Sequence, residues 1–104
     1  MAFEAKSHVW DGTATVRLRG ELAAKSAGQL NRVIAEVSAR PLTRLVLLLD
    51  ELSYLSSAGL RSLVFAHQRL GRGVEIVLVG ARPEVAETIR LTGFDRSVVM
   101  QEPA

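Results

Sequence analysis

The stretch from Leu45 to Leu70 constrains the fold more than any other part of the chain. It opens with five consecutive apolar residues, Leu45 to Leu49, and a run of that length favours a strand buried on both faces. It closes with an apolar stripe at helical spacing, formed by Leu60, Leu63, Val64, His67 and Leu70. A turn and the sequence Ser56-Ser57-Ala58-Gly59 separate the two patterns. Two hydroxyl side chains are therefore expected where a helix begins, beyond the carboxyl end of a buried strand.

That position has a definite chemistry. Open α/β sheets bind ligands and partners at the carboxyl edge of their strands. The first turn of a helix also offers free backbone N–H groups and the positive end of the helix dipole, both of which favour a phosphate. The start of this helix is therefore the first candidate for a functional site.

The other segments predict a regular alternation of strands and helices. Loose alternation over 3–9, the turn signal Asp11-Gly12 and clean alternation over 13–19 indicate a β-hairpin, after which Gly20-Glu21-Leu22 is expected to leave the sheet. Ser26 and Gln29 fit a capping box, and Pro41 is expected to end the helix that follows. The remaining patterns predict a strand over 74–79, a helix from Pro83 to about Thr92 that stops at Gly93, and a short strand over 97–101.

The order β-β-α-β-α-β-α-β predicts an α/β fold with a small mixed, mostly parallel sheet and packed helices. At 104 residues the chain is long enough for one domain, and 48% of its residues are hydrophobic. Its 13 basic residues are scattered rather than clustered, which argues against direct binding of nucleic acid. There is no cysteine, no run long enough to span a membrane and no signal-peptide pattern, so a cytoplasmic protein is expected.

Three features resemble the STAS domain, the fold of bacterial anti-sigma-factor antagonists. Gly20-Glu21-Leu22 is similar to the family's Gly-Glu-Leu-Asp, and Tyr54-Leu55-Ser56-Ser57-Ala58-Gly59-Leu60-Arg61 is similar to its Asp-Ser-Ser/Thr-Gly-Leu signature. The order and length of the elements also agree, so the resemblance covers residues 1–104 as a single STAS-like domain.

The resemblance implies a binding protein and not an enzyme. Its expected partner is an anti-sigma factor that is also a serine kinase, which phosphorylates a serine at the head of the second helix and is thereby released; a serine phosphatase would restore binding. Ser57 matches that serine, and Ser56 is the alternative. The implied partner-binding residues are Glu21, Tyr54, Ser56, Ser57, Ala58, Gly59 and Arg61. No cofactor and no metal are implied.

The chain lacks three acidic residues that the family pattern contains. Ala23 stands at the Asp of Gly-Glu-Leu-Asp, Leu48 stands where many members have an Asp in the third strand, and Ser56 stands where an Asp precedes the phosphorylated serine. Asp50 and Glu51 lie nearby in sequence and are candidates to replace that charge. The fold prediction does not depend on these positions, but recognition of the site by a kinase does.

Each candidate residue also has a purely structural interpretation. Ser57 can be a phosphorylation site or only a helix cap, whereas Ser56 is better interpreted as the cap or a turn former. Gly59 fits close approach of a backbone or partner, and Tyr54 fits either a partner-facing aromatic or a lid on the core. Arg61 can contact a partner carboxylate or a phosphate, or it can be an ordinary solvated arginine.

Two further classes of function compete with the switchable antagonist. One is a STAS scaffold or small-ligand-binding subunit of a larger signalling or transport assembly, without phosphorylation. The other is an enzyme, for which Ser57 and His67 would be the obvious pair. These two residues are ten positions apart along one helix, about 15 Å at the helical rise, so they cannot share a hydrogen bond. His67 is therefore interpreted as a packing residue, and His8 has no metal-ligand spacing to it.

Overall fold

In the computed structural model of the chain, which describes residues 2–102, five strands form one mixed sheet in the order β1-β2-β3-β4-β5. The elements are β1 (Glu4–Trp10), β2 (Thr13–Leu22), α1 (Ala24–Val37), β3 (Arg44–Leu55), α2 (Ser57–Leu70), β4 (Glu75–Val79), α3 (Pro83–Thr92), the 3₁₀ helix η1 (Phe94–Arg96) and β5 (Val99–Gln101). β1 pairs with β2 antiparallel, and all the other pairs are parallel. The predicted α/β class and element order are confirmed.

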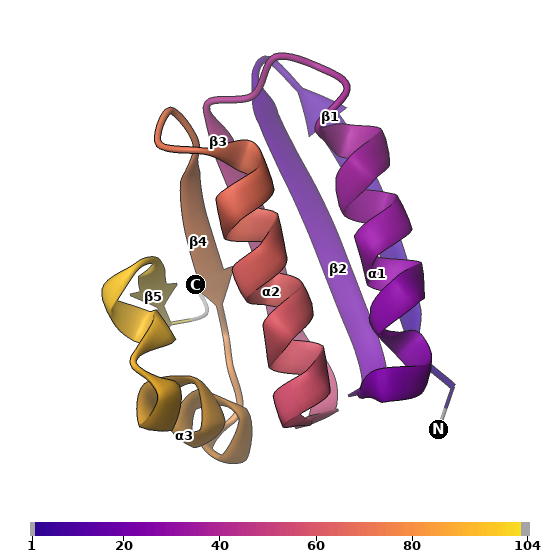
Figure 1. Cartoon of the computed structure of the whole chain (residues 1–104), viewed down its shortest axis with the longest axis vertical. Helices are drawn as coiled ribbons and strands as arrows, with labels where there is room; N and C mark the ends of the chain where they lie inside the picture. The colour runs from indigo at the N-terminus through magenta and orange to yellow at the C-terminus, as the bar shows by residue number, and fades with distance from the viewer. Residues whose placement is uncertain (1, 103–104) are drawn as a thin grey trace.

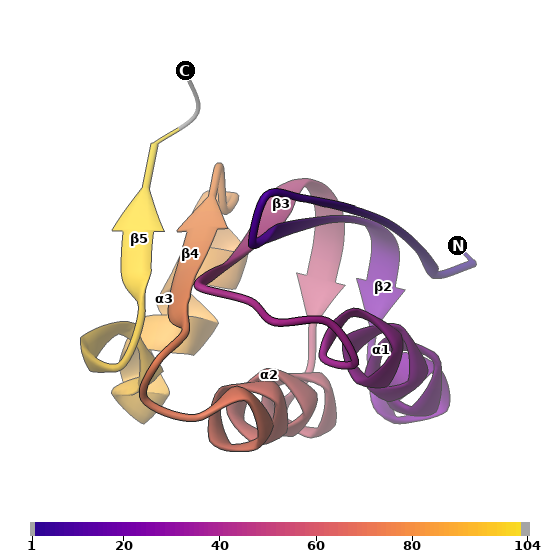
Figure 2. The ribbon, with the colours of Figure 1, turned by 90° about the horizontal axis from the view of Figure 1, so that it is seen from above.

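Helices α1 and α2 lie side by side across the sheet and run in the same direction (Figure 1). Figure 2 shows that both lie on the same side of β2 and β3. The core fills the space between these helices and the sheet and consists mainly of Leu, Val and Ile. Helix α3 and Phe94 pack against it towards β4 and β5. Both helices begin at the carboxyl ends of β2 and β3, and this places their first turns next to each other.

The prediction of a central strand buried on both faces is wrong. Leu45, Leu47 and Leu49 are at most 1% exposed, whereas Val46 and Leu48 between them are only half-buried. Leu48 lies opposite Arg17 of β2 and Val79 of β4, on the face that α1 and α2 leave uncovered. A run of apolar residues indicates a central strand here, but it does not reveal that only one face is covered by helices.

Strands β2 and β3 are both longer than predicted. Gly20-Glu21-Leu22 remains in β2, and the expected turn after Leu49 is absent because β3 continues to Leu55. The two strands stay paired to their ends, with Gly20 opposite Leu52 and Leu22 opposite Leu55, through two shifts of register. The polar residues of both segments are exposed or half-buried strand residues, and the leucines between them face the core.

The predicted capping box at Ser26 is also corrected. α1 begins at Ala24, and Ser26 lies inside the first turn, where its Oγ accepts a hydrogen bond from the N–H of Ala23 at 2.9 Å. The helix ends at Val37, four residues before Pro41. The predicted stop of α3 at Gly93 is confirmed, and β5 is shorter than the predicted 97–101 segment.

Candidate functional site

The first turn of α2 is held by Ser56 rather than by Ser57. Ser56 is the N-cap residue, and its Oγ accepts a hydrogen bond from the N–H of Gly59 at 3.0 Å. The N–H of Ser56 donates to the carbonyl of Leu22 at 3.0 Å and so ties the helix start to the end of β2. The interpretation of Ser56 as the cap is confirmed, and this leaves the hydroxyl of Ser57 without a capping role.

Gly59 makes the close approach that the sequence indicated, and the approaching backbone belongs to this chain. A Cβ built on Gly59 would clash with the carbonyl oxygen of Leu22, and it would lie 2.8 Å from the carbonyl carbon and 2.9 Å from the Cγ of the same residue. Gly59 is buried at this contact. Its role at the site is therefore to let α2 sit directly on the end of β2.

Ser57 is the first residue of α2 and is exposed to solvent. Among residues 2–102 no hydrogen bond is made by its side chain. A phosphate there would meet the free N–H groups of the first turn and the positive end of the helix dipole, both of which stabilise an anion. The geometry therefore allows a modification at Ser57 without breaking a contact of the folded chain.

The other predicted residues lie at the ends of β2 and β3 and in the first turns of α2. Glu21 and Tyr54 are directly opposite each other in the β2–β3 register, and both are exposed. Tyr54 is 51% exposed, so it is not a lid on the core. Ala58 is half-buried and Arg61 is exposed one turn further along α2. We call the exposed or half-buried members of this set the α2-start surface; they are Glu21, Tyr54, Ser56, Ser57, Ala58 and Arg61.

Asp50 and Glu51 do not supply an acid beside Ser57. Glu51 pairs with Arg17 at 2.9 Å and with Arg19 at 3.1 Å, and Asp50 lies 3.8 Å from Arg17. At about 3.3 Å per strand residue, Glu51 is roughly 13 Å from Leu55 at the end of β3. Both carboxylates lie near arginines of β2. The α2-start surface therefore carries Glu21 and Arg61 as its charged residues and has no acid beside Ser57.

His67 is a packing residue, as the sequence indicated. Its half-buried ring lies edge-on to the ring of Phe94, with the centroids 6.1 Å apart. Within residues 2–102 no three His, Asp or Glu side chains come together in an arrangement that could hold a metal ion. The contact with Phe94 accounts for a histidine on the apolar stripe of α2.

Two features of the site were not visible in the sequence. The carbonyl of Leu22 is both the hydrogen-bond acceptor for Ser56 and the surface against which Gly59 packs. Asn31 of α1 has a buried Oδ1 with no hydrogen-bond partner in the described part of the chain. The Gly-Glu-Leu motif is the one signal that could have led to Leu22; nothing in the pattern of α1 distinguishes Asn31 from a solvated residue.

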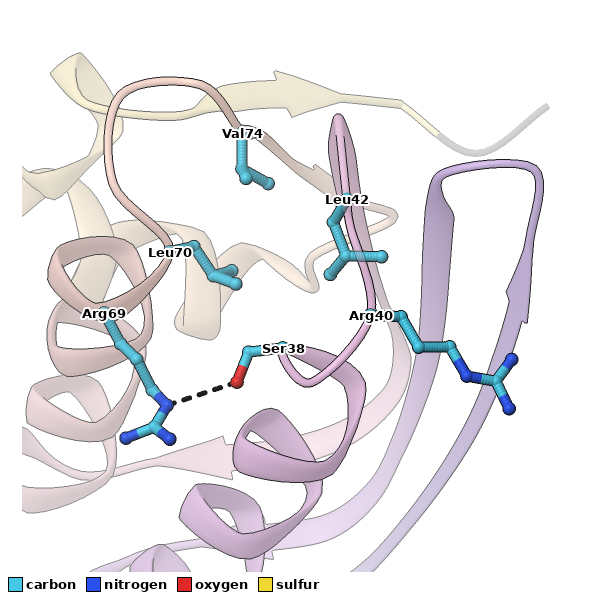
Figure 3. Close-up of a pocket in the computed structure, with 6 residues that line it drawn as sticks. All are labelled: Ser38, Arg40, Leu42, Arg69, Leu70 and Val74. Carbon is cyan, nitrogen blue, oxygen red and sulfur yellow. Dashed lines mark hydrogen bonds between the residues drawn. The ribbon is translucent and has the colours of Figure 1, made fainter.

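A pocket of about 380 Å³ lies at the far end of α1 and α2, away from Ser57 (Figure 3). Its apolar wall is formed by Leu42, Leu70 and Val74, and the Nε of Arg69 donates to the Oγ of Ser38 at 3.2 Å. Figure 3 shows the side chain of Arg40 turned away from this wall. Both helices end here, and their free carbonyls repel anions. The pocket therefore adds no charge or hydroxyl group to the α2-start surface.

The chain is similar to curated proteins along most of its length. It is 30% identical over 87 residues to the anti-sigma-F factor antagonist RsfB of Mycobacterium tuberculosis, covering 84% of this chain and 71% of that protein. It is 34% identical over 85 residues to the putative anti-sigma factor antagonist BtrV of Bordetella bronchiseptica, covering 81% of this chain and 73% of that one. No helix formed by residues 2–102 has the length and apolar character needed to cross a membrane.

The fold has close counterparts among solved structures. The crystal structure of an anti-sigma factor antagonist from Mycobacterium paratuberculosis superposes with a TM-score of 0.87 at 27% identity, covering 96% of this chain and 86% of that one. The STAS domain model matches residues 4–103, which include every strand and helix described above. With the shared fold, this match shows that the chain belongs to the STAS domain family.

Proposed function

We propose that this chain is an anti-sigma-factor antagonist that binds an anti-sigma factor with serine kinase activity through the α2-start surface. The names of the relatives RsfB and BtrV support the class of function. The observation that supports the phosphorylation switch is that two adjacent serines have different roles. Ser56 caps α2, while the exposed Ser57 has no structural task among the described residues. Phosphorylation of Ser57 is the proposed signal that releases the partner.

The switch acts at the interface and not on the fold. A phosphate at Ser57 adds a charge of about −1.5 to −2 at the helix N-terminus, where the dipole stabilises it. The free domain therefore stays folded when phosphorylated. A partner that packs closely on the α2-start surface must instead accommodate that charge, and each 1.4 kcal/mol of lost interaction lowers the affinity about tenfold. A serine phosphatase would restore the binding form.

The missing acids favour a second candidate, a STAS scaffold or small-ligand-binding subunit that is never phosphorylated. Ala23 and Ser56 leave the neighbourhood of Ser57 without a carboxylate, and the pairing of Glu51 with Arg17 and Arg19 means that it does not substitute. A kinase that requires an acid beside its target would not modify this chain. The two candidates differ in whether a charge at Ser57 changes partner binding.

The test is a titration of purified anti-sigma factors of the source organism against three forms of the chain. We expect Ser57→Asp to bind at least tenfold more weakly than wild type, and Ser57→Ala to bind within about threefold of it. Both should melt within a few degrees of wild type, because the cap at Ser56 remains intact. Incubation with the kinase and ATP, followed by mass spectrometry, should place the phosphate on Ser57.

Ser97→Asp is the matched control, since Ser97 is an exposed serine outside the α2-start surface. It should bind like wild type. Equal affinity of Ser57→Asp and Ser57→Ala would eliminate the phosphorylation switch and leave the scaffold. Mapping of the phosphate to Ser56 would move the switch to the capping residue.

A further inference from the structure

A groove of about 490 Å³ runs between α1 and α2 and opens beside the candidate phosphorylation site. We call it the α1–α2 groove. Ala58, Arg61 and Phe65 line it from α2, and Ala27 and Asn31 line it from α1. On α2 the lining extends from Ala58 to Gln68, which is ten residues or about 15 Å of helix. Because Ala58 follows Ser57, the groove is continuous with the α2-start surface.

The exposed wall of the groove is mostly apolar. Phe65 is 49% exposed and lines the groove together with Ala27, Ala58 and Val64. A large aromatic side chain that is half exposed in an apolar groove gains free energy when a partner covers it. An apolar side chain of a partner would therefore complete the groove.

The charged residues around the groove indicate the sign of the charge that its ligand carries. α1 and α2 carry four cations, Lys25, Arg32, Arg61 and Arg69, against one acid, Glu36. Arg61 lines the groove, and in the described structure no carboxylate lies within 4.0 Å of its guanidinium. The arginines on the sheet differ, because Arg17, Arg19 and Arg44 all pair with glutamates. The helix side of the molecule is therefore complementary to an acidic partner.

We propose that the α1–α2 groove receives an acidic amphipathic helix of the anti-sigma factor. An apolar side chain of that helix packs against Phe65, and a carboxylate pairs with Arg61. A third helix fits the channel between two neighbouring helices by the packing of side-chain ridges into grooves. This inference rests on the proposed function and names the partner's chemistry.

The same contacts explain how a phosphate on Ser57 would release the partner. Ser57 and Arg61 are four residues apart on α2, so their side chains are neighbours on one face of the helix. A phosphate on Ser57 therefore competes with the partner's carboxylate for the guanidinium of Arg61. It also repels the acidic helix directly. Arg61 thus couples the groove to the modification.

The experiment measures the affinity of the anti-sigma factor that binds the wild-type chain for three groove variants. Phe65→Ala and Arg61→Glu should each weaken binding at least tenfold. Arg61→Gln should lower the dependence of affinity on salt concentration, because it removes the charged pair. Leu91→Ala and Arg90→Glu, at exposed positions on α3, are the matched controls and should bind like wild type.

Circular dichroism and a thermal melt of every variant identify any variant that fails to fold, so that a loss of structure is not mistaken for a loss of binding.

The outcomes distinguish the two proposals. If the groove variants bind like wild type while Ser57→Asp binds weakly, the proposed function stands and the groove inference is overturned. If no anti-sigma factor of the source organism binds the wild-type chain, the proposed function fails and this inference fails with it. If binding is lost in Phe65→Ala and Arg61→Glu but kept in both α3 controls, the groove is the docking site.

Discussion

The two helices that begin side by side at the edge of the sheet are fixed in different ways, and each has a serine in its first turn. At the start of α1, Ser26 is 8% exposed, and its hydroxyl accepts from Ala23 N–H and donates to the Glu21 carbonyl, each at 2.9 Å. At the start of α2, backbone contacts with Leu22 hold the helix, and Ser57 is free. The comparison shows that burial and hydrogen-bond partners decide which serine is structural and which is available for modification.

The largest expected effect on the stability of the chain comes from the backbone contact that holds α2. Gly59→Ala places a Cβ against the Leu22 carbonyl, which cannot move without shifting β2. We expect a loss of about 3 kcal/mol in the free energy of unfolding, measured by urea denaturation. Gly28→Ala in α1 is the control, because outside its own stretch of helix no described atom lies within 4 Å of its added Cβ. It should stabilise the chain by about 0.5–1 kcal/mol. Similar values for both substitutions would contradict the close packing of α2 on Leu22.

A smaller effect on stability is expected from substitution of Ser26, the serine that holds the start of α1. Ser26→Ala removes a hydroxyl that bonds to the backbone of both Glu21 and Ala23, and it leaves the N–H of Ala23 without its acceptor. We expect a loss of about 2 kcal/mol from these buried groups. Ser57→Ala, measured in the same denaturation series, should change stability by less than about 0.5 kcal/mol. A larger cost at Ser57 than at Ser26 would reverse the assignment of the structural and the available serine.

The smallest effect tests the cap of α2. Ser56→Ala removes the acceptor for Gly59 N–H and should cost about 1 kcal/mol. Ser56→Asp keeps an acceptor and adds a negative charge at the helix N-terminus, so it should be as stable as wild type or slightly more so. Thermal melts of the three proteins provide the measurement. Equal stability of Ser56→Ala and wild type would show that the contacts with Leu22 alone are sufficient to start the helix.

Local patterns in the sequence determined much of the fold. The hairpin around Asp11-Gly12, the alternation of strands and helices and the start of α2 after Ser56 were predicted correctly, because each depends on periodicity or on turn and cap residues close in sequence. The same patterns failed where two elements meet. The ends of β2 and β3 depend on their pairing with each other, so neither Gly20-Glu21-Leu22 nor the segment after Leu49 could be recognised as strand from its own residues.

The candidate site also has features that follow from the local sequence and features that follow only from tertiary contacts. The sequence by itself determined that Ser56 and Ser57 stand at a helix start beside Ala58 and Gly59, since cap residues and helical spacing are local properties. Only the tertiary structure decided what the helix start packs on, because the carbonyl of Leu22, 34 residues before Ser56, accepts a hydrogen bond from the N–H of Ser56 and lies against Gly59. It also decided that Asn31 and Phe65, from different helices, line one groove. Such contacts follow from how α1 and α2 pack on the sheet, which no local pattern contains.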